Sequence, residues 1–172
     1  MGSVAMNPVG ELLTPDDIRL DLDVSTKEQL LEQVAALLAG RHGLSRTFIL
    51  ESLTGRERLG STGVGHGVAI PHARMNQCAA AAGVFVRTRS AIPFDAPDGK
   101  PVSVFLGLIV PNKAVERHLQ ILATAAGMLD DRNFREKLKT CNDPLAVGQL
   151  LAAWPDAPPA RASDQERPAT CD

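Results

Sequence analysis

The chain has 172 residues, 44% of them hydrophobic and 22% charged, which is the composition of one soluble domain with a single core. Its 18 basic and 20 acidic residues leave a net charge of -2, which gives no electrostatic basis for binding nucleic acid or an anionic membrane. No apolar run approaches the ~20 residues of a membrane span, no signal peptide is evident and the cysteines are widely spaced, so a cytoplasmic protein is expected.

A strand and a helix are the first elements predicted. Residues 18–24 (IRLDLDV) alternate apolar and polar side chains, as a half-buried strand does. Ser25 and Glu28 then form a capping box, in which each side chain accepts from the backbone amide of the other, so a helix begins there. Gly40 stands where its C-terminal cap is expected. The side chains that this helix should bury are Leu30, Leu31, Val34, Leu37 and Leu38.

A second helix leads into a glycine-rich loop. Ser45 is the expected N-cap, and the helix runs towards Gly55 or Arg58. The side chains expected to face inward are Phe48, Ile49 and Leu53. The loop, residues 60–74, reads GSTGVGHGVAIPHAR. Its glycines carry no β-carbon, so another backbone or a ligand can approach them closely.

The apolar run inside this loop ends on a histidine next to a proline. Pro71 fixes its own φ angle and favours an extended conformation for Ile70, so the imidazole of His72 should stand at the rigid end of a strand. On spacing alone, a histidine after a strand is more often a structural residue that completes a hydrogen bond than a reactive one. His72 is nevertheless the first candidate for chemistry, because the loop beside it is rich in free backbone amides.

Two further strands follow the loop. The first predicted strand covers residues 79–88 and begins with small side chains. Residues 92–99 are a turn-rich connection. Residues 101–110 (PVSVFLGLIV) are a nearly continuous apolar run, which predicts a strand covered on both faces.

Three helices are predicted to complete the domain. The first starts near His118, and its buried face should comprise Leu119, Leu122, Ala126 and Leu129. A short helix follows over residues 133–139, and the last helix has Asp143 as its cap and Pro144 at its first position. The anchors expected for that last helix are Leu150, Leu151 and Trp154.

These elements predict a single α/β (α+β) domain, with a mixed parallel and antiparallel sheet and helices on both faces. The domain should cover residues 12–154, after a flexible N-terminus over residues 1–11. Residues 155–172 are rich in proline and lack periodic apolar residues, so they are predicted to be a disordered tail.

Several sites are excluded by their missing motifs. The glycine loop is neither GxxxxGK[ST] nor a GxGxxG turn that opens a helix, and the chain has no GxSxG elbow, so nucleotide binding and that class of hydrolase are unsupported. His66 and His72 are too far apart for the metal pair of a helix face, and a zinc site would need His118, Cys78 or distant acids. No cofactor and no metal are therefore expected.

Phosphoryl transfer is the chemistry that the loop can support. Neutral imidazole is a nucleophile near pH 7, and the transfer mainly requires positioning and neutralisation of negative charge. Ser61 and Thr62 could bind the phosphoryl oxygens. His118 could donate a hydrogen bond from the opposite side, and Arg56 could neutralise charge from the end of the second helix. Both residues also have a structural explanation. His118 could merely bond a loop carbonyl, and Arg56 could be a cation that interacts favourably with the C-terminus of its helix.

The motif resembles that of a known family. Residues 56–73, REXLGSTGVGXGVAIPHA with Arg58 and His66 at the X positions, are similar to the active-site signature of the mannitol/fructose-type enzyme IIA domains of the bacterial phosphotransferase system. The nitrogen-regulatory branch is the most similar, and the likeness continues through residues 83–111 and 118–129.

This resemblance implies roles for three residues. His72 matches the histidine that is phosphorylated on Nε2, His118 matches the second active-site histidine, and Arg56 matches the active-site arginine. Two positions depart from the family pattern, since His66 stands where asparagine is frequent and Ala73 where glycine is common. A solvent-facing His66 is favoured over a role in partner docking.

The function expected from the resemblance is that of a phosphohistidine carrier. It would accept a phosphoryl group on His72 from an HPr-like phosphocarrier and regulate target proteins, such as potassium transport or sensor kinase proteins, through its phosphorylation state. One alternative is a fructose- or mannitol-type sugar-transport IIA that passes phosphate to a IIB protein. Another is a regulatory binding module that is not phosphorylated.

Overall fold

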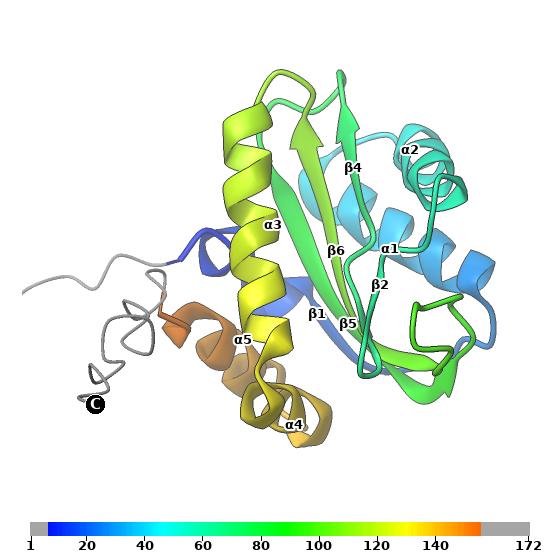
Figure 1. Cartoon of the computed structure of the whole chain (residues 1–172). Coiled ribbons are helices and arrows are strands. Elements are labelled where there is room, and N and C mark those ends of the chain that lie inside the picture. The colour runs from blue at the N-terminus through cyan, green and yellow to red at the C-terminus, as the bar shows by residue number, and fades with distance from the viewer. Residues whose placement is uncertain (1–6, 156–172) are drawn as a thin grey trace, which may run out of the picture.

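The computed structural model describes residues 7–155, in which one mixed sheet lies between two layers of helices (Figure 1). The sheet has six strands in the order β1-β5-β6-β3-β2, and β4 pairs with β6 beyond β3. Pairs β5–β6 and β2–β3 are antiparallel and the others are parallel. The predicted fold class is confirmed. The strands are β1 Ile18–Leu22, β2 Gly63–Gly65, β3 Val68–Ala69, β4 His72–Met75, β5 Ala82–Ile92 and β6 Val102–Pro111.

The five helices divide between the two faces of the sheet (Figure 1). Helices α1 and α2 cover one face, and α3, α4 and α5 cover the other. Short 3-10 helices over Gly10–Leu12 and Pro15–Asp17 precede β1. The helix bounds are α1 Lys27–His42, α2 Arg46–Arg58, α3 Val115–Asp130, α4 Arg132–Thr140 and α5 Pro144–Ala153.

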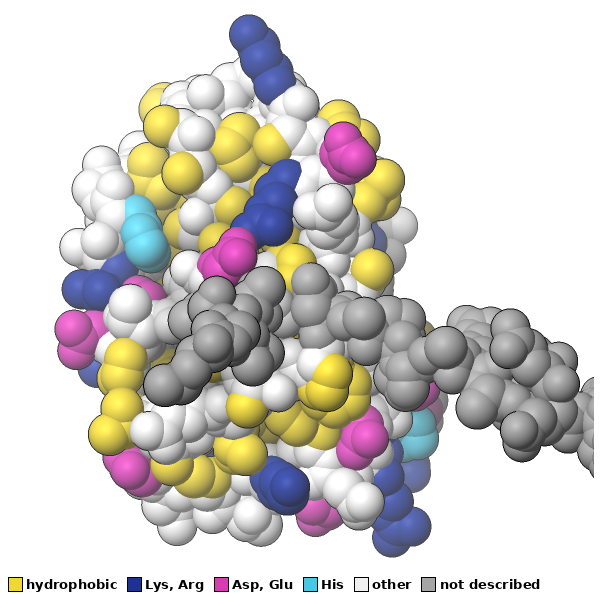
Figure 2. Space-filling view, turned by 90° about the vertical axis from the view of Figure 1, so that its left-hand side faces the viewer, with side chains coloured by type: hydrophobic (Ala, Val, Ile, Leu, Met, Phe, Trp, Pro, Cys, Tyr) yellow, Lys and Arg dark blue, Asp and Glu magenta, His cyan; other side chains and the backbone are white. Residues whose placement is uncertain are grey.

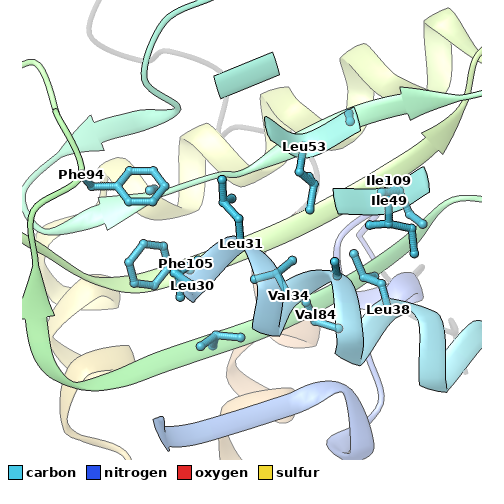
Figure 3. Packing of buried hydrophobic residues seen from close by; sticks show 14 of the residues in the cluster. Leu30, Leu31, Val34, Leu38, Ile49, Leu53, Val84, Phe94, Phe105 and Ile109 are labelled. Atoms are coloured by element: carbon cyan, nitrogen blue, oxygen red, sulfur yellow. The ribbon is translucent and has the colours of Figure 1, made fainter. Parts of the chain in front are cut away.

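Strand β6 is buried on both faces, as its apolar run predicts. Phe105 and Ile109 point into the core under α1 and α2, where Phe105 meets Phe94 edge to face (Figure 3). Leu106 and Leu108 point into the second core, under α3, α4 and α5. The central strand therefore joins two separate apolar layers.

The caps of α1 differ from those predicted. Thr26, not Ser25, is the N-cap, and its hydroxyl accepts from the Gln29 amide at 3.1 Å. The helix continues past Gly40 to His42, because Gly43 supplies the left-handed residue (φ 66) that ends it. The capping-box prediction was thus wrong by one position at the start of the helix.

The predicted caps of α2 and α5 are confirmed at Ser45 and Asp143. The buried faces of α2 and α3, however, differ from those predicted. Phe48 of α2 is exposed, while its neighbours Ile49 and Leu53 are buried. Helix α3 buries a different set from the predicted one, with only the last member shared: Ile121, Ala125, Met128 and Leu129. Leu119, which was expected in the core, is 63% exposed. The α3 helix is therefore turned so that some apolar side chains face solvent.

Part of the N-terminal segment predicted to be flexible packs against the domain. Asn7 and Val9 are buried, and the Asn7 side-chain amide donates to the carbonyls of Leu151 (2.7 Å) and Trp154 (3.0 Å) at the end of α5. These bonds satisfy carbonyl groups that the helix leaves free, so residues before Leu12 also contact the domain. Residues 1–6 and most of the predicted tail, residues 156–172, lie outside the described residues.

Charges of both signs are scattered over the face that Figure 2 shows, among apolar and neutral side chains. No helix within residues 7–155 is both long enough and apolar enough to cross a membrane.

Candidate functional site

A cavity of ≈ 500 Å³ opens beside β4, between helices that cover opposite faces of the sheet. Strand β4 pairs with β6 alone among the described strands, so its other edge is free for the cavity. Helix α2 contributes one wall and the start of α3 the other. The lining residues are Ser52, Arg56, Leu59, His72, Ala73, Arg74, Asn112, Val115, His118 and Leu119. The structure therefore brings three of the predicted residues, His72, His118 and Arg56, into one cavity.

His72 is held by the backbone just before it. Its Nδ1 lies 2.7 Å from the Ile70 carbonyl oxygen, across the intervening Pro71. A carbonyl can only accept, so Nδ1 carries the proton and donates it. In the neutral ring, Nε2 is then the nitrogen with the free electron pair. The geometry thus selects one tautomer and leaves Nε2 available as a nucleophile.

Charge and burial around His72 favour the neutral ring. Burial is the main cause that lowers its pKa, and the hydrogen bond to the Ile70 carbonyl opposes it. The positive charge of Arg56 lowers the pKa further, while the carboxylate of Glu57 raises it. The net direction is downward from the ordinary value of 6.5, so His72 is neutral at pH 7.

His118 faces His72 from the first turn and a half of α3. The two rings meet edge to face, with centroids 5.5 Å apart and an angle of 90° between their planes. Burial lowers the pKa of His118, and the nearby charges of His72 and Arg74 lower it as well. Its Nδ1 atom is buried and has no hydrogen-bond partner among the described residues. A second neutral imidazole therefore stands next to the first.

The charged side chains that line the cavity are all cationic. Arg56 comes from the last turn of α2, where its guanidinium donates to the Gly60 carbonyl at 2.9 Å. Arg74 projects from β4, two residues after His72. No aspartate or glutamate lies among the lining residues. This charge distribution favours an anionic ligand or group.

Ser61 and Thr62 do not reach the cavity. The Ser61 hydroxyl donates to the Phe94 carbonyl at 2.7 Å and accepts from the Gly63 amide. The hydroxyl of the buried Thr62 donates to Glu57 at 2.6 Å. Both side chains support the loop from within, and the structure does not bring them together with His72.

His66 lies in the turn between β2 and β3 and is not among the residues that line the cavity. Its φ of 58 and the φ of 79 at Gly67 place both residues in the left-handed region. A two-residue hairpin turn of this type favours Asn-Gly, so His66 occupies a conformation that asparagine adopts more readily.

Three polar lining residues were not predicted from the sequence, although each had a signal. Arg74 follows His72 by two positions in a strand and so points to the same side. Ser52 precedes Arg56 by one helical turn. Asn112 follows β6, which runs parallel to β4, so the ends of the two strands meet at one edge. Periodicity around His72 and Arg56 thus points to Arg74 and Ser52, and the parallel pairing of β4 with β6 points to Asn112.

Residues 11–154 match the family model described as "Phosphoenolpyruvate-dependent sugar phosphotransferase system, EIIA 2". The chain belongs to this EIIA type-2 family. The predicted resemblance is therefore confirmed at the level of the family.

Relatives of this EIIA domain include regulatory and sugar-specific proteins. A "Nitrogen regulatory protein" of Bradyrhizobium diazoefficiens is 36% identical over 156 residues, which cover 91% of this chain and 99% of the relative. The crystal structure of nitrogen regulatory protein IIA-Ntr from Neisseria meningitidis superposes with a TM-score of 0.80 at 43% identity, over 83% of this chain and 98% of that one. A "PTS system fructose-specific EIIA component" of Haloferax volcanii is 36% identical over 137 residues, covering 78% and 88%. The likeness to the nitrogen-regulatory branch is confirmed.

The residues of this EIIA domain do not form an evident metal centre. Within residues 7–155, no three His, Cys, Asp or Glu side chains are grouped so that they could hold a metal ion. The cavity instead offers two imidazoles, two guanidinium groups and an amide, which are groups that bind or accept a phosphoryl group.

Proposed function

We propose that this EIIA protein carries a phosphoryl group on Nε2 of His72. The observation that supports this most directly is the 2.7 Å hydrogen bond from Nδ1 to the Ile70 carbonyl, which leaves Nε2 with its electron pair. The lowered pKa of the ring keeps that pair free at pH 7. The sequence resemblance described above matches His72 to the histidine that is phosphorylated in the family.

The transfer is a direct exchange between two nitrogen atoms. Nε2 of His72 attacks the phosphorus, and a new N–P bond forms as the bond from phosphorus to the donor's imidazole nitrogen breaks. The electron pair of the broken bond stays on the donor nitrogen. The Nδ1 proton remains on His72, where the Ile70 carbonyl stabilises the positive charge that the ring acquires.

The cavity supplies charge for the transferred group. A phosphoryl group carries about 1.5 to 2 negative charges, and Arg56 and Arg74 lower the free energy of placing it beside His72. The ring centroid of His118 lies 5.5 Å from that of His72, and this second imidazole acts as a donor to a phosphoryl oxygen. The same charge change alters the surface that partners meet.

The donor is proposed to be an HPr-like phosphocarrier, and the targets to be regulatory partners such as potassium transport or sensor kinase proteins, in the cytoplasm. The names of the relatives from Bradyrhizobium and Neisseria favour regulation. The fructose-specific relative supports the alternative, in which a IIB protein receives the phosphoryl group.

Mass spectrometry after incubation with a phosphorylated HPr-like protein tests the proposal. The expected result is the addition of one phosphoryl group to the full chain, lost in His72→Ala and kept in His66→Ala, which removes a histidine outside the cavity. A folded wild-type chain that stays unmodified contradicts the carrier function and leaves the binding module. Addition of IIB and sugar to the phosphorylated chain then separates the two carrier functions, because only the transport alternative yields sugar phosphate.

A further inference from the structure

Glu57 is a buried carboxylate that the mechanism above does not use. Its side chain is only 4% exposed, directly after Arg56 in the last turn of α2. Burial of a carboxylate is unfavourable unless several donors compensate it. Here Lys27 Nζ and the Thr62 amide both lie 3.0 Å from Oε1, and the Thr62 hydroxyl lies 2.6 Å from Oε2. Glu57 therefore binds the loop after α2 through two groups of a single residue.

The loop connects Glu57 to His72 by consecutive hydrogen bonds. The Thr62 carbonyl accepts from the Ile70 amide at 3.0 Å. The Ile70 carbonyl in turn accepts from His72 Nδ1 at 2.7 Å. Displacement of Thr62 would thus move the acceptor that orients the imidazole.

The same loop also holds the cavity's arginine. The Gly60 carbonyl, two residues before Thr62, accepts from the Arg56 guanidinium at 2.9 Å. Gly60 has a φ of 154, in the left-handed half of the map, where side chains are rarely accommodated. A loop with this conformation depends on its anchors, and Glu57 supplies the buried one.

We propose that Glu57 is a positioning residue for phosphoryl transfer at His72. By holding Thr62 it sets the Ile70 carbonyl, which fixes the tautomer of His72, and the Gly60 carbonyl, which holds Arg56. The proposal rests on the proposed function for its effect on rate, but its effect on the imidazole can be measured without any transfer.

The charges around His72 come from three elements. Arg56 and Glu57 belong to α2, Arg74 to β4 and His118 to α3. Glu57 is the one carboxylate among these groups, and it raises the pKa of His72 against the effects of burial and of Arg56. Removal of its charge therefore lowers the pKa of His72.

Lys27, the cation paired with Glu57, also contacts two other side chains. Its ammonium group also lies 3.3 Å from the exposed Asp95 and 4.7 Å from the ring centroid of Phe94. Lys27 thus keeps other partners when Glu57 is changed, which favours folding of the variants.

Three variants separate the hydrogen bonds from the charge. Glu57→Ala removes the acceptors of Thr62, Glu57→Gln keeps an acceptor but removes the charge, and Thr62→Val removes only the hydroxyl bond. Glu32→Gln is the matched control. Glu32 and Glu57 both line a second cavity, of ≈ 440 Å³, but Glu32 lies on α1 and is exposed. Phosphoramidate, a small N–P donor, serves as the phosphoryl source, so that docking of a protein partner does not enter.

Two readouts are used on each full-length variant: the phosphorylation rate by mass spectrometry, and the tautomer and pKa of His72 by nitrogen-15 NMR. We expect Glu57→Ala to slow phosphorylation on the order of 10- to 100-fold and to mix the two tautomers. Glu57→Gln should lower the pKa of His72, and Thr62→Val should slow the reaction less than Glu57→Ala. Glu32→Gln should match the wild type in both readouts.

The proposal is wrong if Glu57→Gln and Thr62→Val both keep the wild-type rate and tautomer, which decides the matter even if Glu57→Ala does not fold. A wild-type chain that no donor phosphorylates overturns the proposed function instead. In that case the NMR readouts still show whether Glu57 controls the imidazole.

Discussion

The imidazole of His118 meets that of His72 edge to face, with ring centroids 5.5 Å apart. In the proposed transfer, His118 donates to a phosphoryl oxygen, so loss of this donor should slow the reaction on the order of 100-fold. His118→Phe keeps an aromatic ring at the contact, whereas His118→Ala removes it. Both variants should be slow by rapid-quench mass spectrometry. Wild-type kinetics in His118→Phe would assign this residue a packing role only.

The pH dependence of stability follows from the two lowered pKa values. Because the folded state binds these protons less readily than the unfolded state, stability contributed by neutral His72 and His118 is complete above pH 6.5 and is lost as the pH falls towards the folded pKa values. Urea unfolding at about pH 8 and about pH 5.5 measures this loss. The double variant His72→Gln with His118→Gln should lose less stability over this range. An equal loss in both proteins would place the titrating groups elsewhere.

Arg56 and Arg58 provide a matched pair in one helical turn. Arg56 lines the cavity with His72, whereas Arg58 lines the second cavity. Arg56→Ala should slow phosphorylation by phosphoramidate roughly 100-fold, because a cation for the phosphoryl oxygens is lost. Arg58→Ala should remain near the wild-type rate. Equal losses in the two variants would indicate a general effect of surface charge.

Gly107 of β6 leaves no room for a side chain between the sheet and Val34 of α1. A β-carbon there would lie 2.6 Å from Val34 Cγ1 and 3.1 Å from Val84 Cγ2. Gly107→Ala should therefore destabilise the fold by about 1 to 3 kcal/mol in urea unfolding. Gly127→Ala, in α3 with nothing within 4 Å, should instead stabilise it by about 0.5 to 1 kcal/mol. A neutral Gly107→Ala would mean that α1 can shift away from the sheet.

The start of α1 provides a test of a single cap. Thr26→Ala should lower the free energy of unfolding by about 1 kcal/mol, because the Gln29 amide loses its acceptor. Ser25→Ala should have little effect, since the Ser25 backbone amide, not its hydroxyl, bonds to Gln29. Thermal unfolding of the two variants distinguishes the caps, and a larger loss in Ser25→Ala would restore the capping box predicted from the sequence.

The layers of the fold were predictable because the apolar pattern of each strand indicates whether one or both faces of the sheet are covered by helices. The continuous apolar run of β6 required cover on both sides, and the alternating pattern of β1 did not. Helix faces were harder. In α3 two sets of apolar side chains fit helical spacing, and periodicity cannot decide between Leu119 and Ile121. The packing of α3 on the sheet buried Ile121 and left Leu119 at the cavity.

Within the candidate site, residues on regular elements were easier to place than residues in the loop. His72, His118 and Arg56 were expected together, and the structure brings them together. Ser61 and Thr62 lie close to them in sequence, but a hydroxyl in a loop can turn to the nearest unsatisfied group. In this loop those groups are the Phe94 carbonyl and the Glu57 carboxylate, both inside the protein.

The cavity lies at the free edge of β4, between the two helical layers, since α2 belongs to one apolar core and α3 to the other. A charge added at His72 is therefore adjacent to the ends of two helices whose cores are separated by the sheet. Amide hydrogen exchange can follow the two helices independently. A partner that binds one layer and a partner that binds the other could thus both sense a single phosphorylation event, each through its own helix.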